Sequence, residues 1–391
     1  MAAQAVVDVE TLDPNALDGI LALQALLSQD LRLSIFQRQI VIADREGQQK
    51  LVFAHGVPDT TILTSAVTVQ NKRMRRALLE QKRVPVPKGA NFSMGRGISL
   101  AKKYADDLGY PVVVKPSKGD AGFYSFTNVR NVRELSEAIS LLKVPVHERE
   151  GVFRSGYTPM ELGIPGVENG RPTVSKGYRF LIEERVSGHL IRFLVHEGAV
   201  ISAVECSGSP SDGGLQGVEE VLDRVDPGLL ESVKQAYEAV PGLAVAAIDV
   251  VATNPWGSQT DEKHWVVDYL ERPFLWVQAK ASATTAATLS RKIVAEYLSQ
   301  RGHDFLPVEE RVALAVKVSA LPSASAAAAE LESAATEIGA LCKISDVSDL
   351  DGSVEAKVSG DSLAVAVLLN ALTNGEYESI PAMMVEVERD E

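Results

Sequence analysis

A lysine at position 115 ends an apolar run and is followed by a polar stretch that contains two glycines. The run reads Tyr-Pro-Val-Val-Val-Lys from Tyr110, and Gly119 and Gly122 lie just behind it. A buried strand that ends in a cation and enters a flexible loop can hold the phosphates of a nucleotide. The lysine supplies charge, and backbone N–H groups beside glycine can approach the anion closely. Many strands end in lysine, so the pattern gains its meaning from its neighbours.

Composition limits the classes of function. The chain has 391 residues, of which 46% are hydrophobic, and this length predicts two or three domains. The formal net charge of −13 argues against a general nucleic-acid or anionic-membrane binder, because such proteins need a basic surface. A phosphate site must therefore be a local cluster of lysine and arginine in an acidic protein.

Cysteine, histidine and the apolar segments give further expectations. Only two cysteines occur, Cys206 and Cys342, and they lack metal-ligand spacing. The six histidines form no HxxH or HExxH pattern, which argues against a zinc enzyme. We see no signal-peptide pattern at the start and no apolar stretch of membrane-spanning length, so we expect a cytoplasmic protein with free thiols.

The elements that must position Lys115 alternate between helix and strand. The basic segment 70–83, which contains Lys72, predicts a helix that ends before Val84-Pro-Val-Pro. Around Lys115 the pattern predicts a helix over 100–108, strands over 112–115 and 124–129, and a helix over 132–142. Residues 145–177 are rich in glycine, proline and charge and predict an irregular lid or insert.

Residues 179–300 contain apolar patterns that predict strands and helices in turn. The pattern predicts strands over 179–183, 191–196, 200–205, 245–252 and 264–270, and helices over 227–239 and 285–300.

Both ends of the chain are expected to be separate, smaller parts. Residues 1–68 predict a small α/β region with a hairpin over 39–54. Residues 310–391 predict the order βαββαβ, which is the signature of a ferredoxin-like module. This module carries no catalytic constellation, so we interpret it as a docking, regulatory or dimerising part, or as a structural cap.

The central region resembles the ATP-grasp superfamily. It is most similar to the ATP-binding half of cyanophycin-synthetase-like and D-alanine–D-alanine-ligase-like carboxylate–amine ligases. The resemblance covers about residues 58–300 and is strongest in NKRMRRALLEQKRVPVPKG and ISLAKKYADDLGYPVVVKP. It implies an α+β protein in which two α+β subdomains, within residues 69–305, grip ATP.

The resemblance also implies which residues contact the nucleotide. Lys72 and Lys115 would reach the phosphates from two sides of a cleft, although a solvated helix face is the simpler reading for Lys72 alone. Glu183 would accept the adenine amino group. The remaining implied contacts are a closing phosphate loop, Gly119, Asp120, Ala121, Gly122 and Phe123, and a hinge, Glu184, Arg185 and Val186. A surface ion pair is the alternative for Glu184.

A magnesium site is implied on the last two strands of the region. Asp249 and Asp268 match the acidic positions, whereas Leu270 stands where the family usually has Asn. Glu271 is a substitute ligand, although strand alternation would point it to the other face. Arg192 and Arg272 are implied to hold a phosphate or a substrate carboxylate, and an ordinary strand-surface arginine is the alternative for each.

The implied reaction is ATP-dependent amide formation with Mg²⁺. A carboxylate would be activated as an acyl phosphate and attacked by an amine, with ADP and phosphate as products. Amino acids or short peptides are the expected small-molecule substrates, and a homodimer is the default assembly. The alternatives are a degenerate ATP-grasp protein that binds nucleotide without turnover, and a kinase or carboxylase on the same scaffold. Neither nucleic acid nor membrane is expected as a partner.

Overall fold

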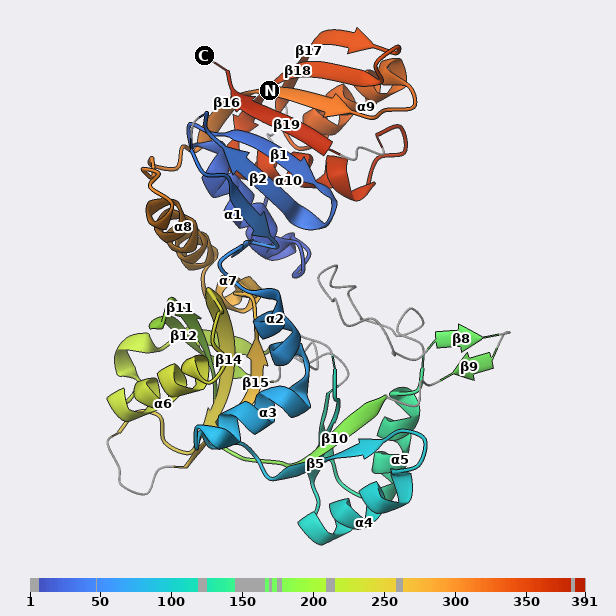
Figure 1. Ribbon diagram of the computed structural model, residues 1–391, viewed down its shortest axis with the longest axis vertical. Coiled ribbons are helices and arrows are strands. Elements are labelled where there is room, and N and C mark those ends of the chain that lie inside the picture. The colour runs from blue at the N-terminus through green and yellow to red at the C-terminus, as the bar shows by residue number, and fades with distance from the viewer. Residues whose placement is uncertain are drawn as a thin grey trace. The chain divides into compact units, whose positions relative to one another are not determined.

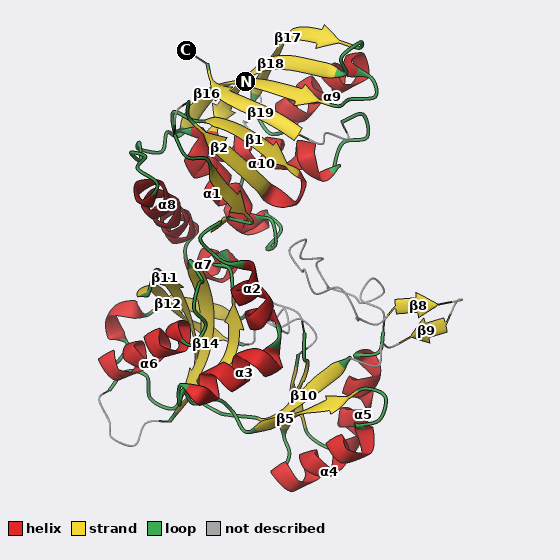
Figure 2. Ribbon diagram, in the orientation of Figure 1, coloured by secondary structure: helices red, strands yellow, loops and turns green. Residues whose placement is uncertain are grey.

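The computed structural model describes most of the chain, and it divides the chain into two compact units. Described residues are 7–46, 48–118, 125–144, 166–168, 171–173, 178–208, 215–257, 263–380 and 384–390. One unit is Thr60–Pro273, and the other combines Met1–Asp59 with Phe274–Glu391 (Figures 1 and 2). Each unit is built on antiparallel sheets with helices against them, a mixed α/β architecture.

The first sheet of unit Thr60–Pro273 has four strands in the order β5-β10-β6-β7. Its strands are β5 (Gly89–Ser93), β6 (Val112–Pro116), β7 (Phe126–Val129) and β10 (Arg179–Glu184). Helices α4 (Ile98–Leu108) and α5 (Val132–Leu141) pack on it (Figure 1). Val112, Val114 and Phe180 face these helices in a common apolar core. The same alternation sends Val113 and Lys115 of β6 to the opposite face of the sheet.

The second sheet of this unit has five strands in the order β13-β12-β11-β14-β15. They are β11 (His189–His196), β12 (Ala199–Ser207), β13 (Gly217–Glu220), β14 (Val245–Ala252) and β15 (His264–Leu270). Helix α6 (Pro227–Glu238) packs on β11, β12 and β14, and α2 (Leu63–Gln70) contacts both β15 and α3 (Lys72–Gln81). Ile191, Phe193, Val233 and Ile248 belong to its core. A separate two-stranded pair joins β8 (Gly166–Glu168) and β9 (Arg171–Thr173).

The second unit contains an eight-stranded sheet in the order β17-β18-β16-β19-β1-β2-β3-β4. The N-terminal part supplies β1 (Arg32–Phe36), β2 (Ile40–Asp44), β3 (Leu51–Ala54), β4 (Val57–Pro58) and α1 (Leu17–Leu27). The C-terminal part supplies α7 (Trp276–Ala281), α8 (Ala283–Gln300), β16 (Arg311–Ser319), α9 (Ala324–Glu337), β17 (Leu341–Ser348), β18 (Ser353–Asp361), α10 (Ser362–Asn374) and β19 (Met384–Arg389).

Most predicted elements are present, with differences that have local causes. The hairpin, the helices around Lys115 and the strands over 245–252 and 264–270 are confirmed. The predicted basic helix over 70–83 begins instead at Lys72, because Asn71 is extended and its side chain caps α3. Strand β1 was not predicted, because the apolar residues of α1 run on almost to its start and give no separate strand pattern. Strand β5 was missed because its sequence, GANFS, has no β-branched residue and contains Gly and Asn, which are depleted in strands.

The structure corrects the expectation that the two ends of the chain are separate parts. Strand β19 pairs with β16 on one side and with β1 on the other, so residues 1–59 and 274–391 share one sheet. Helix α8, predicted as part of the central domain, belongs to this unit. The element order over 311–389 is strand–helix–strand–strand–helix–strand, as predicted. Local sequence patterns could not reveal pairing between segments more than 300 residues apart.

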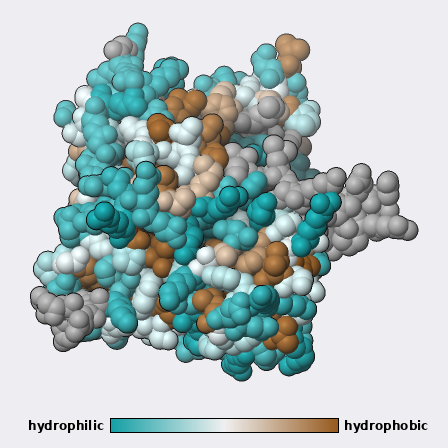
Figure 3. Space-filling model, turned by 60° about the horizontal axis from the view of Figure 1, so that its bottom comes forward, coloured by the Kyte–Doolittle hydropathy of each residue, from teal (hydrophilic) through white to brown (hydrophobic). Residues whose placement is uncertain are grey.

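The molecular surface in Figure 3 is mostly hydrophilic, with apolar residues in separated patches on the face shown. In the part of the chain that the structure describes, none of the helices is both long and apolar enough to cross a membrane.

Leu33→Ala tests the shared sheet. Leu33 is buried and lies opposite Val387 of β19, so the substitution should lower the free energy of unfolding by about 2–5 kcal/mol. It should also speed hydrogen exchange at β19 amides, which are distant in sequence. Arg32→Ala, at an exposed ion pair with Glu388, is the control and should cost less than about 1 kcal/mol. Unchanged exchange in β19 would mean that the two ends fold separately.

Candidate functional site

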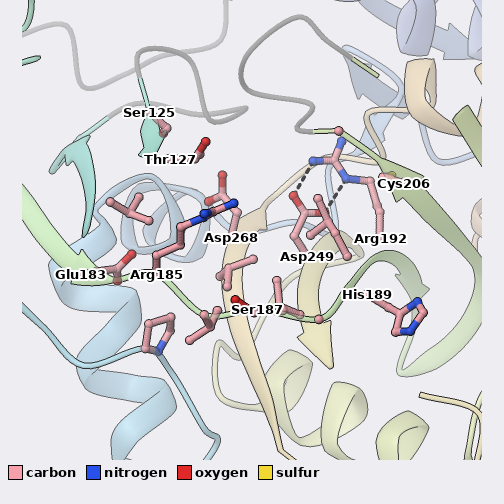
Figure 4. A pocket seen from close by; sticks show the side chains of 18 of the residues that line it. Ser125, Thr127, Glu183, Arg185, Ser187, His189, Arg192, Cys206, Asp249 and Asp268 are labelled. Carbon is pink, nitrogen blue, oxygen red and sulfur yellow. Dashed lines mark hydrogen bonds and ion pairs between the residues drawn. The ribbon is translucent and has the colours of Figure 1, made fainter. Parts of the chain in front are cut away.

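A cavity of about 770 Å³ lies within unit Thr60–Pro273 and is lined from both sheets. This volume is in the range of cofactor and small-molecule sites. The first sheet contributes residues of β6, β7 and β10, and the second contributes residues of β11, β12, β14 and β15. Figure 4 shows the lining side chains, with Arg192, Asp249 and Asp268 near one another.

Lys115 is fixed in this cavity by two contacts. Its Nζ donates to the backbone oxygen of Val267 at 2.9 Å and lies 3.0 Å from Oε2 of Glu183. The first contact joins β6 of one sheet to β15 of the other, directly before Asp268. Burying an ammonium group costs free energy unless an opposite charge and hydrogen-bond acceptors lie close by. Lys115 is therefore a held cation, and its position beside the acidic strand is set by Glu183.

The carboxylate of Glu183 is shared with a second cation. Its Oε1 accepts a hydrogen bond from Arg76 at 3.1 Å. Arg76 also pairs with Glu80 one turn further along α3. With both oxygens bound to cations, the Glu183 side chain serves to position Lys115, and this arrangement differs from the adenine contact that the resemblance implies for it.

A short hinge connects the two sheets. Strand β10 of the first sheet ends at Glu184 and β11 of the second begins at His189, so residues 185–188 are the connection. Oε1 of Glu184 accepts the N–H of Lys88 at 2.8 Å. At Gly188 an added Cβ would lie 2.3 Å from the backbone oxygen of Ala252, so only glycine permits this close approach to β14. Glu184, Arg185 and Val186 all line the cavity.

Asp249 and Asp268 are direct neighbours across β14 and β15. Both oxygens of Asp249 are bound by Arg192, its cross-strand partner on β11, at 2.6 and 2.7 Å. This fork is among the strongest ion pairs available to a buried carboxylate. Each oxygen still has a further lone pair for a cation.

Asp268 is held differently. Its Oδ1 accepts hydrogen bonds from Arg75 at 2.7 Å and from the Tyr269 N–H at 2.9 Å. Arg75 also donates to the backbone oxygen of Tyr269 at 2.6 Å. Among the described residues, no hydrogen bond reaches Oδ2 of Asp268. One oxygen is thus anchored while the other remains available on the cavity wall.

The electrostatic surroundings keep Asp268 ionised. Burial alone would raise the pKa of this carboxyl group. The charges of Arg75, Lys72 and Lys115, with the Tyr269 N–H, outweigh burial and hold the pKa well below its usual range. Lys72 thus acts on the site through its charge, although it does not line the cavity.

Cys206 also lines the cavity, opposite Leu190 in the sheet register. Burial raises the pKa of its thiol to about 12. The thiol is therefore protonated at neutral pH, and a nucleophilic role is disfavoured.

The structure gathers most of the predicted site residues but not all. Those that line the cavity are Lys115, Glu183, Glu184, Arg185, Val186, Arg192, Asp249 and Asp268. Lys72 is buried behind them, with its N–H bonded to the oxygen of Ser117 at 2.9 Å. Gly119, Asp120, Ala121, Gly122 and Phe123 lie outside the described residues, as does most of the lid predicted over 145–177.

Glu271 and Arg272, like Lys72, are predicted site residues outside the cavity lining. Both are fully buried and neither lines the cavity. Glu271 accepts a hydrogen bond from Gln70 of α2 at 2.7 Å. Three positions after Asp268, it lies directly beyond Leu270, the last residue of β15. Within the described ranges, no group of three His, Cys, Asp or Glu side chains could hold a metal ion.

Two carboxylates nevertheless fit magnesium when a phosphate is also present. Magnesium at nucleotide sites commonly takes one or two carboxylates, with phosphate oxygens and waters completing its shell. Asp268 has an available oxygen, and Asp249 lies directly beside it. The donor set therefore suits a metal–phosphate complex better than a metal alone.

Arg75 and Arg76 are site residues that the sequence interpretation missed. They follow Lys72 by three and four positions, so all three lie on one face of α3. This helical spacing was the sequence pattern from which the roles of Arg75 and Arg76 could have been predicted. It was obscured because Arg73, Lys82 and Arg83 make the whole segment basic.

Comparison with known proteins gives similarity only at the level of solved structures. No protein-family model and no curated protein sequence matches the chain. Similar structures include a bifunctional glutathione synthetase from Pasteurella multocida, at 11% identity and a TM-score of 0.45. They also include a D-alanine–D-alanine ligase from Bacillus anthracis, at 13% and 0.41, and the ATP-grasp ligase PsnB complexed with a precursor peptide and AMPPNP, at 15% and 0.39.

The matches cover only part of each protein. The glutathione synthetase match covers 75% of this chain and 45% of that protein. The D-alanine–D-alanine ligase match covers 62% of this chain and 69% of that protein. The PsnB match covers 60% of each. The chain thus spans less than half of the glutathione synthetase. ATP-grasp ligases are among the solved structures to which it is similar.

The ion pair of Asp268 predicts a defined dependence of stability on pH. Since its pKa is lowered on folding, its contribution is complete above the unfolded value of about 3.9 and is lost as pH falls through the lower folded value. Asp268→Asn should therefore be destabilised at pH 7, and its difference from the wild type should narrow below about pH 4. Urea unfolding between pH 2.5 and 7 measures this difference.

Asp107→Asn is the control, because Asp107 is exposed on α4. It should change stability by less than about 0.5 kcal/mol at any pH in this range. A stability difference for Asp268→Asn that stays constant, or widens in acid, would contradict the assigned pKa direction.

Proposed function

We propose that the chain is an ATP-dependent carboxylate–amine ligase that forms an amide bond between amino-acid or peptide-like substrates. One observation carries the proposal: Lys115, from the first sheet, lies in the same cavity as the paired carboxylates Asp249 and Asp268 of the second sheet. A phosphate-binding cation and a pair of hard oxygen donors are thereby brought together. The sequence resemblance of residues 58–300 supports the same reaction class.

The charges of the lining favour a nucleotide that enters with a divalent cation. Apart from histidine, the lining carries three cations, Lys115, Arg185 and Arg192. It also carries five carboxylates, those of Glu183, Glu184, Glu205, Asp249 and Asp268. Arg75 and Arg76, which do not line the cavity, pair with Asp268 and Glu183 and offset part of this negative charge. Asp268 and Asp249 would hold magnesium, which would supply positive charge for the transferred phosphoryl group.

The remaining lining fits the other parts of ATP. The hinge at residues 185–188 offers backbone groups for the edge of a ring, and Glu184 is the carboxylate nearest to it in sequence. Apolar side chains surround this region, with Val113, Val186, Leu190, Val251 and Val267 in the lining. Adenine is a flat, largely apolar ring with a polar edge, so this combination suits it.

The chemistry proposed for the chain requires little proton transfer by side chains. Lys115 would bind phosphate oxygens, and Arg192 would orient an anionic group near Asp249. Attack of a substrate carboxylate on the γ-phosphorus of ATP forms an acyl phosphate and releases ADP. The amine then attacks the acyl carbon and releases phosphate. Positioning and charge neutralisation supply most of the catalysis in reactions of this kind.

A product assay tests the proposal. Purified protein with Mg-ATP and a panel of amino-acid pairs should release ADP and phosphate in equal amounts and form an amide detectable by mass spectrometry. Hydroxylamine in place of the amine should give a hydroxamate, because it captures an acyl phosphate. AMP as the product, or no binding of ATP to folded protein, would contradict the ligase. A phosphorylated alcohol or a requirement for bicarbonate would indicate a kinase or a carboxylase instead.

Nucleotide binding without turnover is a second candidate, and a specific observation favours it. Asp249 and Asp268 are each bound by an arginine, and Leu270 contributes no ligand on β15. Such pairs could satisfy the charges of the site without a metal.

Asp268→Asn and Glu271→Gln together separate the two candidates. If the site is catalytic, Asp268→Asn should reduce ADP release at least about a hundredfold, because it weakens the metal ligand with the available oxygen. Glu271→Gln should retain turnover within about threefold, since Glu271 contacts Gln70 outside the cavity. Both variants are assayed below their melting temperatures.

Equal loss in both variants would mean that Glu271 takes part in the site. Wild-type protein that binds Mg-ATP but gives no product with any substrate pair would support the binding protein.

A further inference from the structure

Strand β17 forms an end of the eight-stranded sheet and has β18 as its only neighbour among the described strands (Figure 1). It is eight residues long, which is longer than most edge strands left open in monomeric proteins. Its outer edge presents backbone N–H and C=O groups that another strand can pair with.

A bulge in β17 places two opposite charges on one face. The register with β18 shifts between Ile344 and Asp346, so Ser345 is the extra residue. In a regular strand Lys343 and Asp346, three positions apart, would point to opposite faces of the sheet. With the shift, Lys343 lies beside Lys357 and Asp346 lies beside Glu355, and both side chains are exposed on the same face of the sheet.

These cross-strand neighbours have like charges. Like charges directly opposite each other destabilise a sheet unless other charges compensate. Lys357 is compensated by Asp390 at 2.6 Å and Glu355 by Lys317 at 2.8 Å. Lys343 and Asp346 form no ion pair with any residue that the structure describes. The outermost strand therefore carries one cation and one anion that are not compensated, three residues apart.

Exposed apolar side chains accompany these charges. Leu341 is 71% exposed and Leu350 is 95% exposed, at the two ends of the same segment. Val347, between them, is also exposed. An antiparallel partner strand along this edge would cover apolar surface at both ends of the segment.

We propose that β17 pairs with β17 of a second copy of this chain, antiparallel and about a two-fold axis perpendicular to the sheet. With the axis between Ile344 and Ser345, Lys343 lies opposite the partner subunit's Asp346, and Asp346 lies opposite the partner subunit's Lys343. Both pairs fall on the same face, because such an axis keeps each face of the sheet on its own side. The Leu341 end of one strand then meets the Leu350 end of the other.

The charge order identifies the occupant as a second copy. A strand that compensates both charges must carry an anion and a cation in the reverse order along an antiparallel strand. The segment itself has this order, and a closed two-fold interface satisfies both positions at once. The inference concerns a unit that contains no residue of the proposed ATP site, so either can fail without the other.

Charge reversal tests the interface on the full-length protein by sedimentation equilibrium. The wild type should be a dimer at low micromolar concentration. Lys343→Asp and Asp346→Lys should each raise the dimer dissociation constant about tenfold or more, because symmetry places two like-charge pairs in the interface. The double variant Lys343→Asp/Asp346→Lys should restore dimerisation, and added salt should weaken the wild-type dimer.

The single variants should fold normally. Each new side chain faces an opposite charge within its own chain, Lys357 for Lys343→Asp and Glu355 for Asp346→Lys. Circular dichroism melts check this point. Lys103→Asp, the same change at an exposed position of α4, is the matched control and should remain dimeric.

Two results would overturn the inference. A wild type that stays monomeric at tens of micromolar would mean that the charges and the bulge keep this edge free. A dimer that persists unchanged in both single variants would mean that the copies associate through another surface.

Discussion

The arrangement of the cavity in unit Thr60–Pro273 depends on the cost of burying charge. An ionised side chain removed from water is stable only with an opposite charge and hydrogen bonds close by. Three such pairs stand at the wall of the cavity: Lys115 with Glu183, Arg192 with Asp249, and Arg75 with Asp268. Each pair joins different elements, so the requirement for pairing also fixes how β6, β10, β11, β14, β15 and α3 meet. The same contacts that satisfy the charges therefore build the site.

The two arginine–aspartate pairs leave different numbers of carboxylate oxygens without a hydrogen bond from arginine. Asp249 uses both oxygens in a fork with Arg192, whereas Asp268 is anchored through one oxygen. The two aspartates, neighbours in register, are thus inequivalent. We infer that Asp268 supplies the more accessible metal ligand and that the Arg192–Asp249 pair mainly fixes the strand geometry beside it.

Much of this arrangement could be predicted from the sequence, and the exceptions have physical reasons. The family resemblance pointed to Asp249 and Asp268, and strand alternation raised the objection to Glu271, which accepts a hydrogen bond from Gln70 in the structure. The roles of Arg75 and Arg76 depend on which strand α3 packs against, and periodicity does not contain that information. The same holds for Glu183, whose partners come from two other elements. The pairing of β1 with β19 joins segments at opposite ends of the chain, so local sequence patterns could not predict it either.

Hydrogen exchange measured with a non-hydrolysable ATP analogue and Mg²⁺ tests the central claim most directly. Binding between the two sheets of unit Thr60–Pro273 should slow exchange at the hinge, residues 185–188, and in the peptides that contain Asp249 and Asp268. Exchange in β16–β19 of the other unit should not change. If saturating nucleotide leaves the hinge and both acidic strands unaffected, or protects only the other unit, the assignment of this cavity to ATP is wrong.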